Sequence, residues 1–282
     1  MYTRILFLFS IALLFTFSAC TDSKSSAKDK EGDKEQGIEQ FGDNKDFQEE
    51  HEIPKDISYK GKGRMMSIPT TDGKDARAYV NAPKGNQGKV LLVFHEWWGL
   101  NDFIKREVDR YAEALGDVMI IALDLYDGNV TDDRDKAGEF MKAVTEERAR
   151  TIISAGMGFS GSGARIGSIG WCFGGGWSLK ASIMLGDQGV GCVMYYGMPV
   201  ENAVDLAPIK ADVLGIFAVK DGWITPEVVQ KFEENCKISR TKLTVKSYDA
   251  EHAFANPSSP RYNESAAQEA NKEAMSFLKA RF

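Results

Sequence analysis

The sequence predicts an α/β domain whose mostly parallel sheet is covered by helices on both faces. Strand-like and helix-like segments alternate from about Ile57 to the end of the chain. Several strand-like segments, including 90–94 and 118–122, are continuous apolar runs, as in strands buried on both faces. The 282 residues, 43% of them hydrophobic, suffice for one large core. Because no repeat or internal boundary appears after residue 57, we expect one domain over 57–282.

Local signals place the elements of this domain. The turn signal Thr71-Asp72-Gly73 separates the first two strands and predicts an antiparallel pair. Asp102 can cap the first helix, and Thr225 followed by Pro226 starts another. The remaining helices are expected over about 133–156, 174–185 and about 263–280. Strands are predicted at 64–68, 76–81, 90–94, 118–122, 165–169, 190–196, 213–219 and 243–248.

The N-terminal residues predict export. Arg4 precedes an apolar run over 5–17 and two small residues, a pattern of signal peptides that is too short for a lasting membrane span. A buried core helix is the alternative, but a long polar tract follows at once. Residues 1–19 are therefore expected to be a signal peptide. Cys20 then resembles the lipidated cysteine of a bacterial lipobox, although Phe17 replaces the usual leucine, and ordinary signal cleavage stays open. Lipidation implies a lipid anchor on the periplasmic or outer-membrane face of the cell envelope.

Residues 20–56 are predicted to form an acidic, disordered tether. Residues 21–56 carry six lysines against twelve aspartates and glutamates, with almost no apolar content, so they bury too little surface to offset the entropy of ordering. This imbalance equals the formal charge of the whole chain, −6. The folded part shows no basic stripe, which makes nucleic acid an improbable partner.

The run Gly170-Trp171-Cys172-Phe173-Gly174 predicts a nucleophile elbow with cysteine as the nucleophile. It joins a predicted strand to a predicted helix, and small residues on both sides allow the sharp turn. The N–H groups of the helix would favour a thiolate and then an oxyanion. A nucleotide-binding turn is the alternative, but bulky Trp171 and Phe173 alternate with the glycines where a G-x-G-x-x-G pattern would be expected.

A cysteine nucleophile needs a base. The chain has three histidines, of which His51 lies in the predicted tether and His95 ends a buried strand. His252 follows the last strand and fits the order nucleophile, acid, histidine. Asp221, after the preceding strand, is the preferred acid because loops beyond strand carboxyl ends gather the site. The rival acids are Asp212, Asp249 and Glu251.

These motifs together resemble the dienelactone hydrolase family. The resemblance rests on Glu96 in the loop after an early strand, the Gly-x-Cys-x-Gly-Gly elbow, the acid, and His252-Ala253-Phe254, and it covers about 57–282. It implies an α/β-hydrolase fold, with Glu96 holding the resting thiol until substrate binds. The backbone N–H groups of Trp97 and Phe173 are the expected oxyanion donors.

The implied activity is hydrolysis of a small ester or lactone through a thioester on Cys172. Trp98, Trp171 and Trp223 are candidates for an apolar substrate pocket. Family members that act on carboxylated lactones use arginines, and here only Arg134 and Arg261 are available, at positions that no motif secures. A neutral and an anionic substrate both stay open.

No cofactor is expected, and no cluster of histidine, cysteine and carboxylate predicts a metal site. Cys192 reads as a small buried hydrophobe, and its pairing with Cys236 stays open. The alternative function is a membrane-tethered ligand-binding protein on an inactive hydrolase scaffold. A thiol redox protein is disfavoured because the chain lacks a C-x-x-C motif. The oligomeric state is not predicted.

Overall fold

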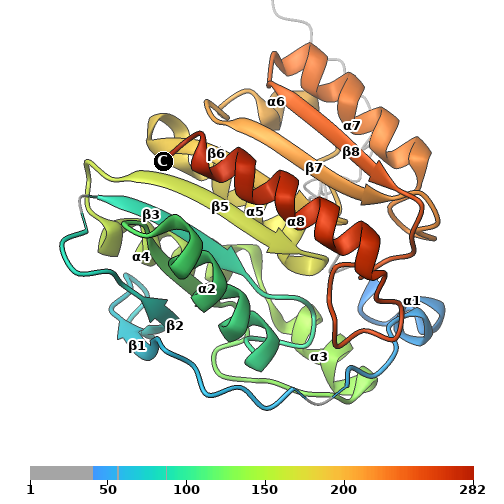
Figure 1. Cartoon of the computed structure of the whole chain (residues 1–282), viewed down its shortest axis with the longest axis horizontal. Coiled ribbons are helices and arrows are strands. Elements are labelled where there is room, and N and C mark those ends of the chain that lie inside the picture. The colour runs from blue at the N-terminus through green and yellow to red at the C-terminus, as the bar shows by residue number, and fades with distance from the viewer. Residues whose placement is uncertain (1–40, 56, 87) are drawn as a thin grey trace, which may run out of the picture. The chain divides into compact units, whose positions relative to one another are not determined.

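A computed structural model describes residues 41–55, 57–86 and 88–282. Their centre is an eight-stranded sheet with the order β1-β2-β4-β3-β5-β6-β7-β8 (Figure 1). The strands are β1 (Arg64–Ile68), β2 (Ala76–Asn81), β3 (Lys89–Phe94), β4 (Met119–Asp124), β5 (Arg165–Trp171), β6 (Gly189–Tyr195), β7 (Asp212–Ala218) and β8 (Leu243–Tyr248). β2 pairs antiparallel with β1 and β4, and all the other pairs are parallel. The predicted α/β fold with a mostly parallel sheet is confirmed.

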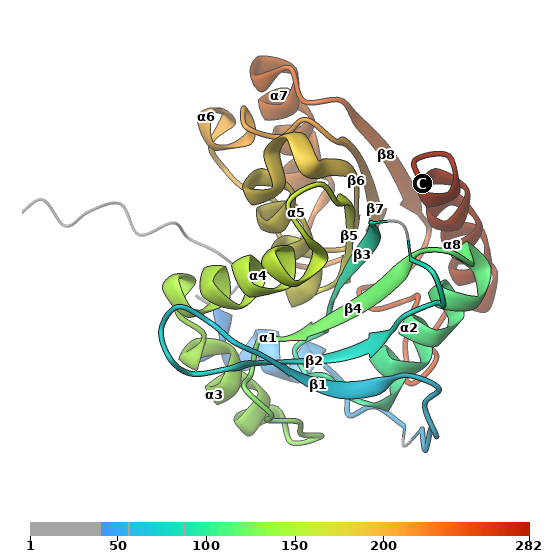
Figure 2. The same cartoon turned by 90° about the vertical axis from the view of Figure 1, so that its left-hand side faces the viewer.

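Helices cover both faces of the sheet (Figure 2). α2 (Asp102–Leu115) and α8 (Glu264–Lys279) lie on one face, and α4 (Glu146–Ser160), α5 (Phe173–Leu185) and α7 (Pro226–Ser239) lie on the other. The described part also contains α1 (Lys45–Glu50), α3 (Arg134–Ala143), α6 (Ala203–Leu206) and the short 3-10 helix η2 (Gly186–Gln188). The inner parallel strands β3, β5, β6 and β7 are mainly buried because both of their faces are covered, whereas the edge strand β8 has no fully buried residue.

One predicted helix cap was wrong, and one predicted helical stretch divides in two. Asn101, rather than Asp102, caps α2, because its side-chain oxygen accepts a hydrogen bond from the backbone N–H of Ile104 at 3.2 Å. The helical segment expected over about 133–156 is two helices, α3 and α4. Thr145 separates them by capping α4 through the N–H of Arg148 at 3.1 Å.

The turn from β5 into α5 is as sharp as the elbow motif predicts. Cys172 stands between the two elements with φ 55° and ψ −121°, in a region that non-glycine residues rarely adopt. Gly174 allows the close approach of α5 to β3, since a Cβ atom there would lie 2.3 Å from the carbonyl oxygen of Phe94. The local chain path therefore holds the side chain of residue 172 at the carboxyl end of the sheet.

The predicted tether extends too far along the chain. Residues 41–55, here called the strap, are ordered against the domain and include α1. Phe47 is fully buried, and the carbonyl oxygen of His51 accepts a hydrogen bond from Nε of Arg134 at 2.6 Å. The average composition of 20–56 hides these few side chains, which gain enough buried surface and hydrogen bonding to hold the segment in place.

The predictions for the extreme N-terminus stay predictions, because the signal peptide, Cys20 and the tether up to residue 40 lie outside the described residues. Among the described residues, no helix is both long enough and apolar enough to cross a membrane.

Candidate active site

The predicted nucleophile lies at the start of α5. Cys172 is 2% exposed, and its backbone N–H donates to the carbonyl oxygen of Tyr195 at 3.0 Å. Phe173 is the first residue of α5, so its N–H belongs to the helix N-terminus beside the sulfur. This position favours negative charge on the sulfur and on an oxyanion next to it.

His252 and Asp221 form the predicted histidine–acid pair. Nδ1 of His252 lies 2.6 Å from Oδ2 of Asp221, in the loops that follow β8 and β7. The other carboxylate oxygen accepts from the backbone N–H groups of Trp223 at 2.9 Å and Ile224 at 3.0 Å. Since a carboxylate only accepts, Nδ1 of His252 carries the proton and Nε2 is left for the thiol.

Burial alone would lower the pKa of His252, but the nearby Asp221 carboxylate and Cys172 raise that pKa well above its ordinary value. Burial would likewise raise the pKa of Asp221, and the charge of His252 with its hydrogen bond lowers that pKa instead. The Asp221 carboxylate therefore stabilises positive charge on the imidazole. This is the charge distribution that a histidine base needs after it accepts a proton.

His51, which sequence reasoning assigned to the tether, is a third member of the site. Its Nε2 lies 3.6 Å from Sγ of Cys172, and its Nδ1 lies 2.7 Å from the carbonyl oxygen of Phe47. Because a carbonyl only accepts, Nδ1 donates and Nε2 is free to accept a hydrogen bond from the thiol. Burial, followed by the proximity of His252, lowers the pKa of His51 to about 3, so His51 is neutral at pH 7.

A local signal for this residue exists but is weak. The side chain of Asn44 accepts a hydrogen bond from the backbone N–H of Phe47 at 3.1 Å and so caps α1. In the sequence, this signal is an asparagine three residues before a phenylalanine. His51 follows one helical turn after Phe47, and the rings of the two residues are 4.3 Å apart. Nothing in the sequence indicates that this face meets Cys172, 121 residues away.

Glu96 is buried in the site, but it does not hold the thiol as the family resemblance implies. Its Oε2 accepts from Nδ2 of Asn256 at 2.5 Å, while the hydrogen-bond partner of Sγ of Cys172 is His51. Burial raises the pKa of Glu96 to about 7, against the effect of the Asn256 bond, which lowers it. Asn256 was not predicted as a site residue. The sequence offers no signal for it beyond its position four residues after His252.

His95 has a structural role, in agreement with its exclusion as the base. Its Nδ1 lies 2.6 Å from the carbonyl oxygen of Glu96, and its Nε2 accepts from the backbone N–H of Leu125 at 3.1 Å. Both ring nitrogens are thereby used to join the loop after β3 to the end of β4.

The predicted aromatic pocket residues separate into three groups. Trp97 and Trp98 line the cavity beside Cys172. Trp171 does not line that cavity, because its ring packs against Phe103, Tyr111 and Tyr195 in the core. Trp223 contacts the strap instead, with its ring 4.9 Å from Phe41 and 5.3 Å from Phe47. Of the three predicted pocket tryptophans, only Trp98 lies where the prediction placed it.

The strap fills the space over Cys172. The cavity beside Cys172 has a volume of about 20 Å³ and is lined by His51, Glu52 and Pro54 of the strap, by Arg261, and by residues of the loops after β3 and β8. This volume holds about one water molecule. Arg261 thus lies at the site, with Nε 3.9 Å from a carboxylate oxygen of Glu52, whereas Arg134 holds the strap backbone.

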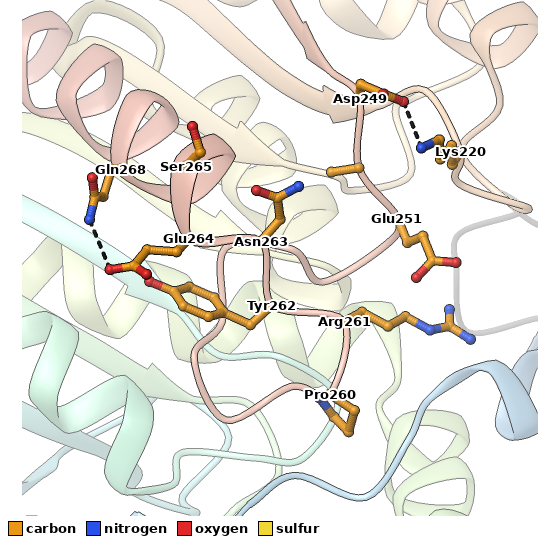
Figure 3. Close-up of a pocket in the computed structure, with 11 residues that line it drawn as sticks. Lys220, Asp249, Glu251, Pro260, Arg261, Tyr262, Asn263, Glu264, Ser265 and Gln268 are labelled. Atoms are coloured by element: carbon orange, nitrogen blue, oxygen red, sulfur yellow. Dashed lines mark hydrogen bonds and ion pairs between the residues drawn. The ribbon is translucent and has the colours of Figure 1, made fainter.

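A much larger hollow lies next to this cavity. It measures about 940 Å³ and is lined mainly by polar residues of the loops after β7 and β8 and of the start of α8 (Figure 3). Lys220 and Asp249 form an ion pair at 2.8 Å in it, and Glu251 points into the same region. Asp249 and Glu251 therefore line this hollow, and the carboxylate that contacts His252 is that of Asp221. Asp212, the remaining rival acid, pairs with Lys242 and Arg281.

The other described cysteines, Cys192 and Cys236, are buried free thiols. Burial raises the pKa of Cys192 to about 11 and that of Cys236 to about 12, which keeps both protonated at pH 7. Contrary to the expectation of no metal-binding cluster, His51, Cys172 and His252 place one ligand atom each within 4.8 Å of one another.

Comparison with known proteins assigns this arrangement to a family. The sequence profile of the dienelactone hydrolase family matches residues 76–282, which is most of the chain. The chain belongs to the dienelactone hydrolase family. The predicted family resemblance and α/β-hydrolase fold are thereby confirmed.

Several known proteins are similar to this chain over nearly their whole length. Protein usf of Aquifex pyrophilus is 29% identical over 230 residues, which cover 77% of this chain and 98% of that protein. Carboxymethylenebutenolidase 1 of Cupriavidus pinatubonensis is 26% identical over 229 residues, which cover 76% of this chain and 95% of that protein.

Solved structures share the fold. A dienelactone hydrolase-like promiscuous phosphotriesterase from metagenomic libraries matches with a TM-score of 0.67 and 21% identity, over 79% of this chain and all of that one. A dienelactone hydrolase from Anabaena variabilis matches with a TM-score of 0.58 and 16% identity, over the same shares.

Proposed function

We propose that this member of the family hydrolyses a small carboxylic ester or lactone through a thioester on Cys172. The observation that carries the proposal is the convergence of a strained, buried cysteine at a helix N-terminus with a histidine whose Nδ1 is held by Asp221. Relatives named carboxymethylenebutenolidase support a lactone as the substrate class.

The proposal assigns a residue to each step. His252 accepts the thiol proton through Nε2, and the thiolate attacks the substrate carbonyl. The N–H groups of Phe173 and Trp97 are the proposed donors to the resulting oxyanion. His252 returns its proton to the leaving oxygen, which departs from the carbonyl carbon as an alcohol or enol. Water, deprotonated by His252, then attacks the thioester and releases the acid and the thiol. Asp221 holds the Nδ1 proton throughout.

The strap has to move during this cycle. An ester group does not fit in the cavity of about 20 Å³ beside Cys172. His51, whose Nε2 contacts Sγ of Cys172, is part of the strap. We propose that the docked strap represents the resting enzyme, in which His51 accepts the thiol hydrogen bond that the family resemblance assigns to Glu96. Substrate entry then separates His51 from Cys172 and passes the thiol proton to His252.

Arg261 gives a basis for anionic substrates. Its side chain lines the cavity, and its nearest carboxylate partner, Glu52, belongs to the strap. When the strap moves, this guanidinium would be available to a substrate carboxylate.

The test is hydrolysis of an activated aryl ester by the full chain, which retains the strap. The wild type should give a burst of aryl alcohol and a mass increase of one acyl group on the peptide that contains Cys172. Cys172→Ala should lose the burst and the adduct, while Cys236→Ala, which removes another buried thiol, should keep both. Equal turnover by wild type and Cys172→Ala would overturn the nucleophile assignment and favour the ligand-binding alternative.

A further inference from the structure

Three buried side chains that can bind a metal ion meet at the nucleophile. They are His51 from the strap, Cys172 from the elbow and His252 from the loop after β8, and their ligand atoms lie within 4.8 Å of one another. Two imidazoles and one thiolate form a ligand set of the kind found at zinc sites that keep a fourth position open.

Both histidines already have the supporting contacts that metal-bound histidines use. Nδ1 of His252 is held by the Asp221 carboxylate at 2.6 Å, and Nδ1 of His51 by the carbonyl oxygen of Phe47 at 2.7 Å. Such partners fix the proton on Nδ1 and aim the unprotonated Nε2 at the ion. Nε2 of His252 is buried and makes no hydrogen bond to any other described residue. The site thus holds an aimed, unused acceptor beside a thiol.

The one ligand distance that the structure fixes agrees with zinc geometry. Zinc bonds of about 2.3 Å to sulfur and about 2.1 Å to nitrogen, at a tetrahedral angle, place the two ligand atoms about 3.6 Å apart. Nε2 of His51 and Sγ of Cys172 are 3.6 Å apart. The ligand atom of His252 lies within 4.8 Å of the other two. Side-chain rotations that move this atom by about 1 Å would complete the set.

We propose that His51, Cys172 and His252 form a zinc-binding site that reversibly blocks the nucleophile and locks the strap over it. On binding, the Cys172 S–H bond breaks, a zinc–sulfur bond forms, and the proton goes to solvent. A water molecule takes the fourth position, for which the cavity of about 20 Å³ has room. Zinc is favoured over the harder ions Mg²⁺ and Ca²⁺ because all three ligands are nitrogen or sulfur.

The proposal links metal binding to the strap. Two ligands belong to the catalytic loops, and the third comes from a segment that has to move for substrate to enter. Coordination would therefore inhibit in two ways, by occupying the sulfur's electron pair and by fixing residues 41–55 in the docked position. A chelator should reverse both.

The direct test is titration of the reduced full chain with Co²⁺, a spectroscopic substitute for zinc, followed by competition with Zn²⁺. The wild type should give the near-ultraviolet thiolate-to-cobalt charge-transfer band and the intense visible bands of tetrahedral cobalt, with one ion per chain, and Zn²⁺ should remove them. Because the readout is absorption, it is independent of whether the chain hydrolyses the ester chosen for the activity test.

Two variants test proposed ligands, and two others serve as controls. Cys172→Ser should lose the charge-transfer band, and His51→Ala should weaken affinity by more than about 100-fold, beyond the effect of losing an outer partner. Glu49→Ala, at an exposed position of the strap, is the matched control for His51→Ala and should bind as the wild type does. Cys20→Ser controls for the thiol outside the described residues. Circular dichroism of each variant checks that the fold persists.

Two results would overturn the proposal. One is a wild type that shows no charge-transfer band, and the other is a folded His51→Ala variant that binds Co²⁺ with wild-type affinity and spectrum. The second result would place any metal on Cys172 and His252 without the strap.

Discussion

Phe47 is the main hydrophobic anchor of the strap, and its removal should open the active site without unfolding the domain. The ring is fully buried and packs against three other rings. The distances between ring centroids are 4.3 Å to His51, 5.3 Å to Trp223 and 5.8 Å to Trp97. Replacing a buried phenylalanine with alanine costs about 3–5 kcal/mol. If the substitution destabilises only the docked state of the strap, the ratio of open to docked strap rises by about 100-fold to several thousand-fold, because each 1.4 kcal/mol changes this equilibrium constant tenfold.

Hydrogen exchange and thiol alkylation measure this population. The backbone N–H groups of Gln48 and His51 donate hydrogen bonds within the strap. In Phe47→Ala, their protection against hydrogen exchange should fall by the same factor, down to the level of a fully undocked strap. Alkylation of Cys172, 2% exposed in the docked state, should accelerate in proportion. Amides of β5 should keep their protection.

Phe159→Ala is the matched control, because Phe159 is 41% exposed and lies on α4. It should change neither strap protection nor the alkylation rate. Unchanged alkylation in Phe47→Ala would refute the idea that the strap limits access to the sulfur. An equal loss of protection in β5 would show instead that the strap and the core unfold together.

Three further changes test other parts of the site and the fold. Arg261→Gln should raise KM by about 10- to 100-fold for an ester that carries a carboxylate and leave KM for its neutral analogue unchanged, as steady-state kinetics would show; equal effects on both esters would exclude carboxylate recognition. Asp221→Asn should lower kcat by roughly 10³- to 10⁴-fold with little change in thermal stability, because Nδ1 of His252 loses its acceptor; retained turnover would argue against the pair. Asp109 accepts from Tyr59, Lys62, Tyr79 and Asn81, and although burial would raise its pKa, these hydrogen bonds lower it. Its contribution to stability is therefore complete above the pKa of an unfolded aspartate and is lost as the pH falls through the lower folded value. Asp109→Asn should cost about 1.5–3 kcal/mol at pH 7, measured by urea unfolding, and should make stability less dependent on pH below about 4; an unchanged acid limb would contradict this.

Several features of the site are local enough for the sequence to predict. The elbow is one, because the glycines around Cys172, the strand before it and the helix after it are adjacent in the chain. The assignment of Asp221 and His252 is another, since both follow strands whose carboxyl ends meet at one edge of a parallel sheet. The structure places His252 and Asp221 2.6 Å apart, as that reasoning expected.

The sequence by itself determined the elements, the mostly parallel sheet and the order of the candidate catalytic residues, because these depend on local turns, apolar runs and strand ends. Only the tertiary structure decided which side chains surround the sulfur. Trp171 faces the core and Trp98 the cavity, although both lie in strand or loop segments near the site. His51 reaches Cys172 from a segment whose average composition predicts disorder, because docking depends on a few aromatic contacts to residues far along the chain. Such contacts leave no periodicity in the sequence. The surface on which the strap docks exists only once the rest of the domain has folded.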